Sequence, residues 1–252
     1  MIDKEAILQG IENALYSVKI AETEQEVDAA LRLRYNVFIG ELDRDFNAKD
    51  GRDYDVFDDQ CHHLIVVEKS TDKVIGTYRL QTLELAKKGK GFYTYKRFKL
   101  DQLPRRVHEN GVEIGRACVH EDHRNGRVLF LLWKGLAGYL EYFQKRYLFG
   151  YTALSTTNPQ IALNTYSYLD ENNFLNPNLH IEVKEAYKCS VDSEQKETTD
   201  EIDMPDLLKN YLDVGTSVCS LPAHDKDLQL IHIFTLMDVE QISDRVRKLF
   251  FG

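Results

Sequence analysis

The chain has 252 residues and a formal net charge of −9, so we expect a globular protein of one large or two small domains. No apolar run is long enough to cross a membrane, the N-terminal residues lack the apolar core of a signal peptide, and the acidic balance argues against nucleic acid as a bulk partner. The four cysteines lie far apart without a C-x-x-C pair, which favours reduced thiols in a cytoplasmic protein.

Hydrophobic spacing predicts the elements of the first part of the chain. Residues 3–15 have a helical stripe, and residues 16–21 have the pattern of a short strand. Thr23, with Glu26 three residues later, is a capping box for a helix that runs to Phe38. Residues 63–68 and 74–83 have the composition of antiparallel strands around the turn 69–73.

The second part continues with alternating strands and helices. One predicted strand begins at residue 112, and the others cover 147–155, 180–187, 217–219 and 228–237. The predicted helices cover 127–146, 158–169, 205–214 and 239–250. Residues 190–203 are polar and acidic, which predicts a loop. The class is α+β with a mostly antiparallel sheet. We expect a single domain over 1–252, with a core at about 16–189, an acidic loop at 190–203 and a C-terminal extension at 204–252.

The stretch from 112 to 133 combines chemistry with a strand–turn–helix pattern. The strand contains Glu113 and Arg116, and the turn before the helix contains Arg124, Gly126 and Arg127. The first turn of a helix offers free N–H groups and a positive dipole end, so this turn is a candidate anion site. An ordinary β-turn-α unit with a solvated turn explains the pattern equally well.

Basic residues concentrate between positions 86 and 106, where eight Lys and Arg residues accompany one acidic residue. Such an island on an acidic protein is suited to an acidic macromolecule or an anionic lipid surface. A solvated face without a partner is the simpler alternative.

Five motifs occur in order along the chain: LRYNVF at 33–38, DVFDDQCHHLIV at 55–66, GTYRL at 76–80, EIGRACVHEDHRNGRVLFLLW at 113–133 and YLFGYTALS at 147–155. Together they resemble the acyl-carrier-protein-dependent amino-acid N-acyltransferases, which make ornithine and glycine lipids. That family belongs to the GNAT superfamily and is related to the acyl-homoserine-lactone synthases. The resemblance spans roughly 31–238 and includes the C-terminal run 204–238, so it implies a GNAT-like fold with a C-terminal extension.

The resemblance implies a reaction and a set of catalytic groups. An amino acid's α-amine would attack an acyl or 3-hydroxyacyl thioester on the phosphopantetheine arm of acyl carrier protein, with no other cofactor. Glu113 would accept the amine proton, and the backbone N–H of Val119 would stabilise the thioester oxygen, with Arg116 beside them. A structural ion pair with Arg116 or Arg79 is the alternative role for Glu113.

The resemblance also implies a polar substrate pocket. Its members are Arg34, Phe38, Asp55, Asp58 and Arg79, whose charged groups would form an ion-pair network around the acceptor. A solvated acidic loop is the alternative.

The candidate phosphate site and the adjacent histidines complete the ligand predictions. Arg124, Gly126 and Arg127 would hold the phosphate of the carrier's arm. No metal site is expected, because the adjacent residues Cys61, His62 and His63 on a strand cannot readily converge on one ion.

Acyl carrier protein would dock on the basic segment through Lys96, Arg97, Lys99, Arg105 and Arg106. The other expected partners are the amino-acid acceptor, a separate downstream O-acyltransferase and, through a weak peripheral contact, the inner membrane. Two rival functions are a signal synthase of the N-acyl amino acid or homoserine-lactone type and a non-catalytic carrier-protein-binding module. Residues 39–46 lack the Trp of the lactone synthases, which argues against the first rival.

Overall fold

The structure is a computed structural model that describes residues 8, 10–41, 50–190 and 200–251. These residues form two compact units. The first unit comprises residues 1–91, 112–145 and 247–252, and the second comprises 92–111 and 146–246. The α+β class with a mostly antiparallel sheet is confirmed. The single-domain assignment stays a prediction.

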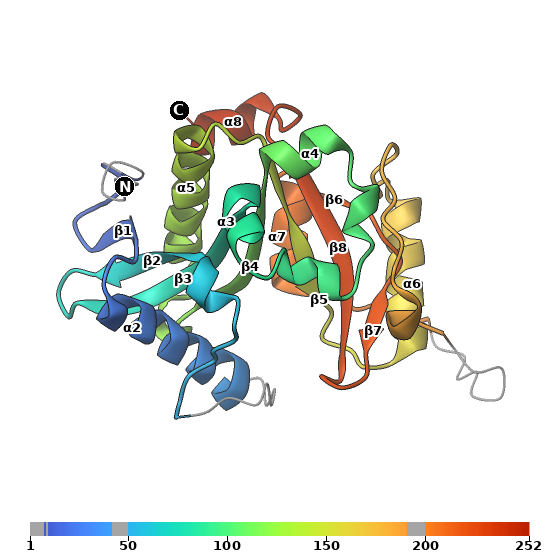
Figure 1. Cartoon of the computed structure of the whole chain (residues 1–252), viewed down its shortest axis with the longest axis horizontal. Coiled ribbons are helices and arrows are strands. Elements are labelled where there is room, and N and C mark those ends of the chain that lie inside the picture. The colour runs from blue at the N-terminus through green and yellow to red at the C-terminus, as the bar shows by residue number, and fades with distance from the viewer. Residues whose placement is uncertain (1–7, 9, 42–49, 191–199, 252) are drawn as a thin grey trace. The chain divides into compact units, whose positions relative to one another are not determined.

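The first unit contains antiparallel strands in the order β1-β2-β3-β4 (Figure 1). The strands are β1 (Tyr16–Ile20), β2 (His62–Glu68), β3 (Lys73–Thr82) and β4 (Gly111–Val119), and the helical elements are α2 (Glu24–Tyr35), η1 (Asn36–Glu41), η2 (Asp58–Gln60), α3 (Leu83–Lys88), η5 (Glu121–His123) and α5 (Arg127–Tyr142). Helices α2 and α5 pack on opposite faces of these strands (Figure 1).

Helix α2 begins where the sequence predicts. The Thr23 side chain accepts from the Glu26 backbone N–H at 3.2 Å, and the Glu26 carboxylate accepts from the Thr23 N–H at 3.2 Å. Ala30 of this helix then packs against Ile65 and Val67 of β2. The predicted capping box is therefore confirmed, and it fixes the helix that carries the first arginine of the site.

Helix α5 approaches the other face of the strands at a glycine. A Cβ at Gly135 would lie 2.8 Å from Leu64 Cδ1, so any larger residue would push the helix away from β2. The Trp133 indole N–H donates to Tyr78 Oη of β3 at 3.4 Å on this same side. The face that carries α2 is thus left for the polar side chains described below.

The second unit is built around β5 (Tyr147–Ala153) and β8 (Leu230–Asp238), which are antiparallel. Strands β6 (Ser217–Val218) and β7 (Ala223–Asp225) both pair with β8. Its helical elements are η3 (Tyr93–Lys96), η4 (Leu100–Gln102), α4 (Arg105–Asn110), α6 (Pro159–Glu171), η6 (Glu185–Tyr187) and α7 (Asp206–Asp213). The C-terminal extension therefore supplies β8, the partner strand of β5. It ends in α8 (Asp244–Phe250).

Three predicted elements differ from the structure. The strand predicted at 180–187 is a single bridge between Val183 and Phe98 followed by η6, because its neighbours on both sides are irregular segments. The helix predicted at 3–15 does not include residues 10–15, which form a turn and a bridge from Glu12 to Ser17. The final helix begins at Asp244 rather than 239.

Two predicted elements lie partly outside the described residues, and one short strand is not among the predicted elements. Residues 3–7 and 9 of the predicted first helix and residues 191–199 of the predicted acidic loop are outside the described residues. Strand β7 was not predicted at all, since three residues carry too little pattern. Within the described part of the chain, no helix is both long enough and apolar enough to span a bilayer.

Candidate active site

A buried arginine of α2 is the first member of a charged cluster in the first unit. Arg34 is fully buried, its Nε donates to Asp53 Oδ2 at 2.7 Å, and its Nη1 donates to Asp58 Oδ1 at 2.7 Å. Both carboxylates belong to the loop and turn that precede β2, so the ion pairs fasten this loop to α2. A buried guanidinium with two carboxylates satisfies its charge and its hydrogen bonds together.

Arg79 of β3 extends the cluster towards the sheet. Its Nη1 donates to Asp55 Oδ1 at 2.7 Å and to Asp58 Oδ1 at 3.2 Å. Burial alone would raise the pKa of Asp58, but the charges of Arg34 and Arg79 outweigh it and hold that pKa well below the usual value. Asp58 is therefore an ionised hub between two guanidinium groups.

A β-bulge in β4 adds the third arginine. Arg79 pairs with Gly115 and Thr77 pairs with Cys118, so two residues of β4 lie opposite one residue of β3. Arg116 occupies the bulge with φ +52°, a left-handed conformation that costs about 1 kcal/mol for a residue with a Cβ.

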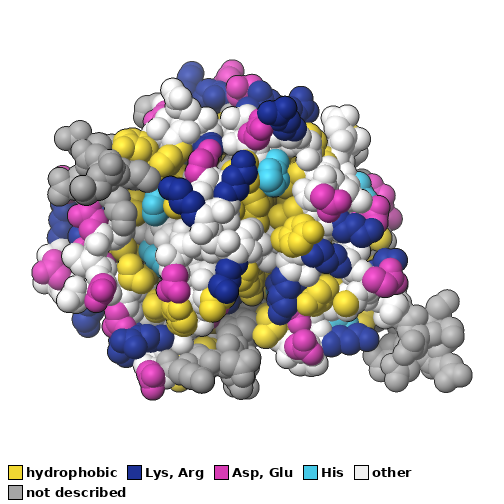
Figure 2. All heavy atoms as spheres, in the orientation of Figure 1, with side chains coloured by type: hydrophobic (Ala, Val, Ile, Leu, Met, Phe, Trp, Pro, Cys, Tyr) yellow, Lys and Arg dark blue, Asp and Glu magenta, His cyan; other side chains and the backbone are white. Residues whose placement is uncertain are grey.

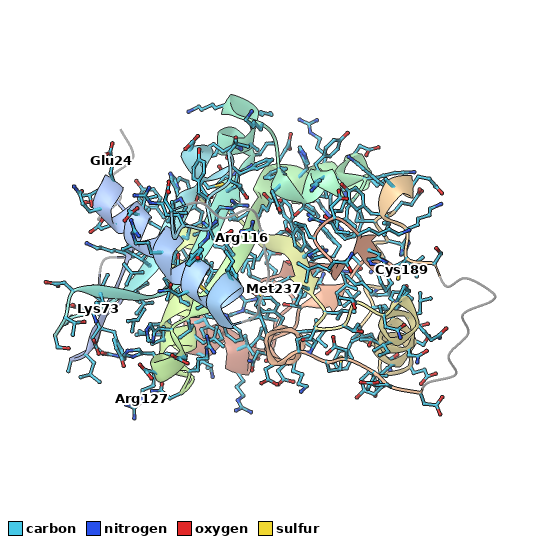
Figure 3. The ribbon with its side chains drawn as sticks, turned by 90° about the horizontal axis from the view of Figure 1, so that it is seen from below. Glu24, Lys73, Arg116, Arg127, Cys189 and Met237 are labelled. Carbon is cyan, nitrogen blue, oxygen red and sulfur yellow. The ribbon has the colours of Figure 1, made fainter. Side chains whose placement is uncertain are left out.

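The bulge brings the side chain of Arg116, which is labelled in Figure 3, to the loop that contains Asp53 and Asp55. Its Nε lies 3.1 Å from Asp53 Oδ2, and its Nη2 donates to Asp55 Oδ2 at 3.4 Å. The Arg116 and Asp55 side chains remain 13% and 22% exposed, whereas those of Arg34 and Asp58 are only 1% exposed. The cluster therefore has a sealed end at Arg34 and an open end at Arg116 and Asp55.

Glu113 lies on the same face of the sheet as the cluster. It pairs with Gln81, as Gly115 pairs with Arg79, and cross-strand partners share a face. Burial raises the pKa of the nearby Cys61 thiol to about 12, with the charges of Arg79 and Glu113 among the smaller influences. The buried carboxylate of Glu113 therefore lies two residues before Gly115, after which the bulge begins.

Gln81, the cross-strand partner of Glu113, belongs to a hydrogen-bond network that the sequence did not predict. Gln81 Oε1 accepts from Gln60 Nε2 at 3.0 Å and from Cys61 Sγ at 2.9 Å, and Gln81 Nε2 donates to the Gly91 carbonyl at 2.6 Å. Asp53, which binds both Arg34 and Arg116, was also not singled out as a site residue. In the sequence, the only indication of a role for Asp53 is that it lies two positions before Asp55 in the same loop.

The two adjacent histidines face opposite sides of β2, as expected for a strand. His62 Nδ1 lies 2.9 Å from Tyr139 Oη, and His63 Nε2 lies 3.3 Å from the Asp58 carbonyl oxygen. Because a carbonyl only accepts, His63 Nε2 carries the proton. Burial lowers the pKa of His63 to about 4, so it is neutral near pH 7. Among the described residues, no group of three or more His, Cys, Asp and Glu could hold a metal ion.

The turn between β4 and α5 has the geometry of an anion site. Gly126 caps α5 with φ +84°, and the first helical turn contains no acidic residue. Arg124 and Arg127 are exposed beside it, and Arg124 Nε donates to the Val119 carbonyl at 3.0 Å. The backbone N–H groups that begin a 16-residue helix therefore lie next to two cations.

The hydrogen bonding at the end of β4 sets the direction of the Val119 N–H, which is the predicted backbone donor. The His120 N–H donates to the Ile75 carbonyl of β3 at 2.8 Å. Because successive N–H groups of a strand point to opposite sides, the Val119 N–H points away from β3. Phe38, the remaining predicted pocket residue, packs in η1 against Leu33, Val37 and Cys118.

The predicted ion-pair network is therefore present in the first unit. Arg34, Asp55, Asp58 and Arg79 come together as expected, and the solvated-loop alternative does not hold for Asp58. The roles of these residues in binding and catalysis stay predictions.

The predicted docking residues lie in the second unit, and Arg97 needs correction. Arg97 is completely buried, where it forms an ion pair with Asp225 and lies 5.6, 5.1 and 5.9 Å from the ring centroids of Tyr93, Tyr151 and Tyr187. It cannot reach a docking partner, because the rings and the carboxylate enclose it.

The other four docking residues are more accessible. The side chains of Lys96, Lys99 and Arg105 are 44%, 42% and 88% exposed, and Arg106 is exposed. Lys99 and Arg105 are paired with Glu182 and Glu109, respectively. On the face shown in Figure 2, cationic, anionic and hydrophobic side chains are interspersed.

Comparison with known proteins bears on the class of the chain. Residues 33–134 match the family model of an acetyltransferase (GNAT) domain. The chain is 28% identical to the L-ornithine N(alpha)-acyltransferase of Rhodobacter capsulatus over 247 residues, which cover 93% of this chain and 94% of that protein. It is also 28% identical to the enzyme of the same name from Brucella abortus, over 96% of this chain and 90% of the relative.

Solved structures show the same fold at low identity. The acyl-homoserine-lactone synthase LasI superposes with a TM-score of 0.54 at 13% identity, covering 95% of this chain and 96% of LasI. The CoA-dependent synthase BjaI superposes with a TM-score of 0.51 at 14% identity, covering 90% of this chain and 81% of BjaI.

These findings show that the chain has the GNAT fold, and that residues 33–134 match an acetyltransferase (GNAT) domain. Over nearly its whole length the chain is similar to the L-ornithine Nα-acyltransferases, and its structural neighbours include acyl-homoserine-lactone synthases.

Proposed function

We propose that the chain transfers an acyl or 3-hydroxyacyl group from the phosphopantetheine arm of acyl carrier protein to the α-amine of an amino acid. The similarity to L-ornithine Nα-acyltransferases over nearly the whole chain supports ornithine as acceptor, with glycine as the alternative. The observation that carries the proposal is the open end of the cluster, where a guanidinium and a carboxylate are partly exposed on the sheet face that also carries a buried glutamate.

This open end complements an amino-acid zwitterion. The Arg116–Asp55 contact of 3.4 Å is longer than the 2.7 Å contacts of Arg34 and Arg79 and lies at the least buried positions of the cluster. An acceptor would place its carboxylate on Arg116 and its ammonium near Asp55. Arg34, Asp58 and Arg79 hold the loop in place behind this pair.

Glu113 is the proposed proton acceptor. The acceptor's ammonium must lose a proton before its nitrogen can attack the thioester carbon, and a carboxylate within reach, directly or through one water, provides the base. As the C–N bond forms, the thioester oxygen gains negative charge, which the Val119 N–H would stabilise. After the attack the nitrogen is cationic and loses a second proton, and collapse of the tetrahedral intermediate breaks the C–S bond. Of the two protons that the ammonium loses, one passes through Glu113 to the leaving thiolate and the other goes to solvent.

The donor would be held at the start of α5. The Arg127 N–H donates to Asn125 Oδ1, so a single phosphate of the arm would use the later N–H groups of the first turn together with the exposed cations Arg124 and Arg127. The carrier protein itself would contact the exposed basic residues of the second unit, Arg105 and Arg106 in particular. Unlike Arg97, these two can be changed without opening a buried ion pair.

Kinetics with purified enzyme test the proposal. With acyl carrier protein and ornithine or glycine, Glu113→Gln should lower kcat/KM by about 10²- to 10⁴-fold because the base is lost. Glu171→Gln, at an exposed glutamate that ends α6, is the matched control and should retain activity. Turnover equal to wild type in Glu113→Gln would refute Glu113 as the base, and no N-acylation by the folded wild type would favour the binding-module rival.

Carrier docking has its own test. Arg105→Glu combined with Arg106→Glu should raise KM for the acylated carrier roughly tenfold at low salt, an effect that weakens as ionic strength rises. The same variant should turn over acyl-pantetheine, which lacks the carrier protein, at the wild-type rate. An unchanged KM for the carrier would remove the docking role.

A further inference from the structure

The C-terminal residues form a surface that the proposed reaction does not use. Helix α8 contains no buried residue, and Leu249 is 46% exposed. The Phe250 ring lies 5.6 Å from Phe130 and 5.4 Å from Trp133, both on α5. The final turn of α8 therefore lies against the outer side of α5 within the first unit.

We propose that this surface binds an anionic lipid membrane. We call it the C-terminal patch, and its members are Phe130, Trp133, Lys134, Arg247, Lys248, Leu249, Phe250 and Phe251. The inference goes beyond the proposed function, because it concerns where the protein resides and not which bond it makes.

Charge complementarity is the first argument. The chain has a net charge of −9, yet neither residues 127–134 nor residues 245–251 include an acidic residue, and together they include five basic ones. A local cationic surface on an acidic protein is attracted to the negative surface potential of anionic lipids, at roughly a fivefold gain in partitioning for each Lys or Arg near the surface.

The mixture of side chains is the second argument and selects lipid over an acidic protein. Leu249 and Lys248 are exposed next to each other, and Phe250 and Phe251 are half-buried. Lys134 Nζ lies 5.7 Å from the centroid of the half-buried Phe130 ring, so its stem covers apolar surface while its charge faces water. Aromatic rings flanked by Lys and Arg are typical of the membrane–water interface.

The geometry limits the mode of binding. The last turn of α8 is too short to enter the bilayer as a span, and its apolar residues directly follow two cations. Leu249 and the edges of the rings would reach the boundary between headgroups and acyl chains, while Lys134, Arg247 and Lys248 contact phosphates. Binding should therefore be reversible and sensitive to salt.

Co-sedimentation with lipid vesicles tests the inference on the full-length chain. We expect association with vesicles of phosphatidylcholine mixed with phosphatidylglycerol and little with phosphatidylcholine alone. Lys134→Gln combined with Lys248→Gln should lower the partition coefficient about 25-fold. Leu249→Ser should lower it severalfold because less apolar surface is buried.

The matched control is Lys209→Gln combined with Lys226→Gln, which removes two exposed lysines elsewhere in the chain. The control pair should bind vesicles as the wild type does, and melting temperatures should show that all variants remain folded. Equal binding by the two pairs, or no binding to phosphatidylglycerol vesicles by the wild type, would overturn the inference.

Turnover of acylated carrier without vesicles separates this inference from the proposed function. The Lys134 and Lys248 variant should retain the wild-type KM for the carrier. A raised KM with unchanged vesicle binding would assign the patch to the carrier protein and overturn the lipid proposal. Loss of vesicle binding with normal turnover would support it.

Discussion

Among the described residues, one arginine in each unit is completely buried, and the surroundings of the two differ. Arg34 in the first unit binds two carboxylates, Asp53 and Asp58. Each of these also pairs with another arginine, Asp53 with Arg116 and Asp58 with Arg79. Arg97 in the second unit binds one carboxylate, Asp225, and is otherwise surrounded by three tyrosine rings. The first arrangement ends at a guanidinium and a carboxylate that are both partly exposed, whereas Arg97 and Asp225 are both completely buried, with the partly exposed Lys96 at 3.7 Å from Asp225.

The difference separates two uses of a buried guanidinium. A network that reaches partly exposed groups can exchange one of its contacts for a charged ligand, as Arg116 and Asp55 would with an amino acid. A guanidinium and a carboxylate that are both completely buried cannot be reached by a charged ligand, so the role of such a pair is to hold segments together. Arg97 and Asp225 join the basic segment to β7 of the second unit in this way.

The largest expected effects come from removing one carboxylate from each arrangement. Asp58→Asn leaves Arg34 and Arg79 without their shared hub and should lower the free energy of unfolding by about 3–5 kcal/mol. Asp225→Asn should cost less, about 3 kcal/mol, since the tyrosine rings still stabilise the Arg97 cation. Urea unfolding of both variants measures the costs.

Activity then distinguishes the two units. Under conditions where both variants are folded, Asp58→Asn should lose most of kcat/KM, because the loop that carries Asp55 is no longer held. Asp225→Asn should retain it. A fully active Asp58→Asn would mean that the first cluster is as purely structural as the second.

A smaller effect concerns His63, which lies beside the first cluster. Its pKa is lowered to about 4 from an ordinary value near 6.5 in the unfolded chain, so the unfolded state binds more protons between these two values. The free energy of unfolding should therefore fall by about 2–3 kcal/mol as the pH is lowered from 6.5 to 4.

Replacement of the histidine checks this assignment. His63→Gln should reduce that pH dependence, whereas His180→Gln, at an exposed histidine, should leave it unchanged. Urea unfolding at a series of pH values is the measurement. An identical slope in wild type and His63→Gln would contradict burial as the cause of the lowered pKa.

The smallest effect tests the bulge that opens the first cluster. Because Arg116 has φ +52°, Arg116→Gly should be more stable than Arg116→Ala by about 1 kcal/mol, although glycine is usually the less stable choice. Both variants lose the same ion pairs, so the comparison isolates the backbone. At Arg124, where φ is −79°, the glycine variant should show no such advantage. Equal stabilities at position 116 would argue against a left-handed bulge.

The features of the first unit that depend on local sequence could be predicted, and those that depend on strand register could not. The capping box of α2 depends on residues three positions apart, so it was predicted and found. The first cluster was anticipated from motifs that occur together in a known family. The bulge at Arg116 could not be anticipated, because it depends on the register between β3 and β4 and not on local composition.

Arg97 shows why a run of charges misleads. Lys96 and Arg97 are neighbours with the same charge, yet Lys96 is half-exposed and Arg97 is buried, because η3 ends between them. Its acidic partner, Asp225, lies far along the chain in an unpredicted strand. The strand expected at 180–187 fails for a related reason, since the buried residues Ile181 and Val183 alternate with exposed ones but contact separate irregular segments.

The most direct test of the central claim is mass spectrometry of lipids from cells that overexpress the protein, beside cells that express Glu113→Gln. The account predicts a new N-acyl amino acid in the wild-type extract, with the acceptor identified by its mass, and a strongly reduced amount in the variant extract. If both proteins are present in folded form and neither extract contains a new N-acyl amino acid, the proposed transfer to an amino-acid amine is contradicted.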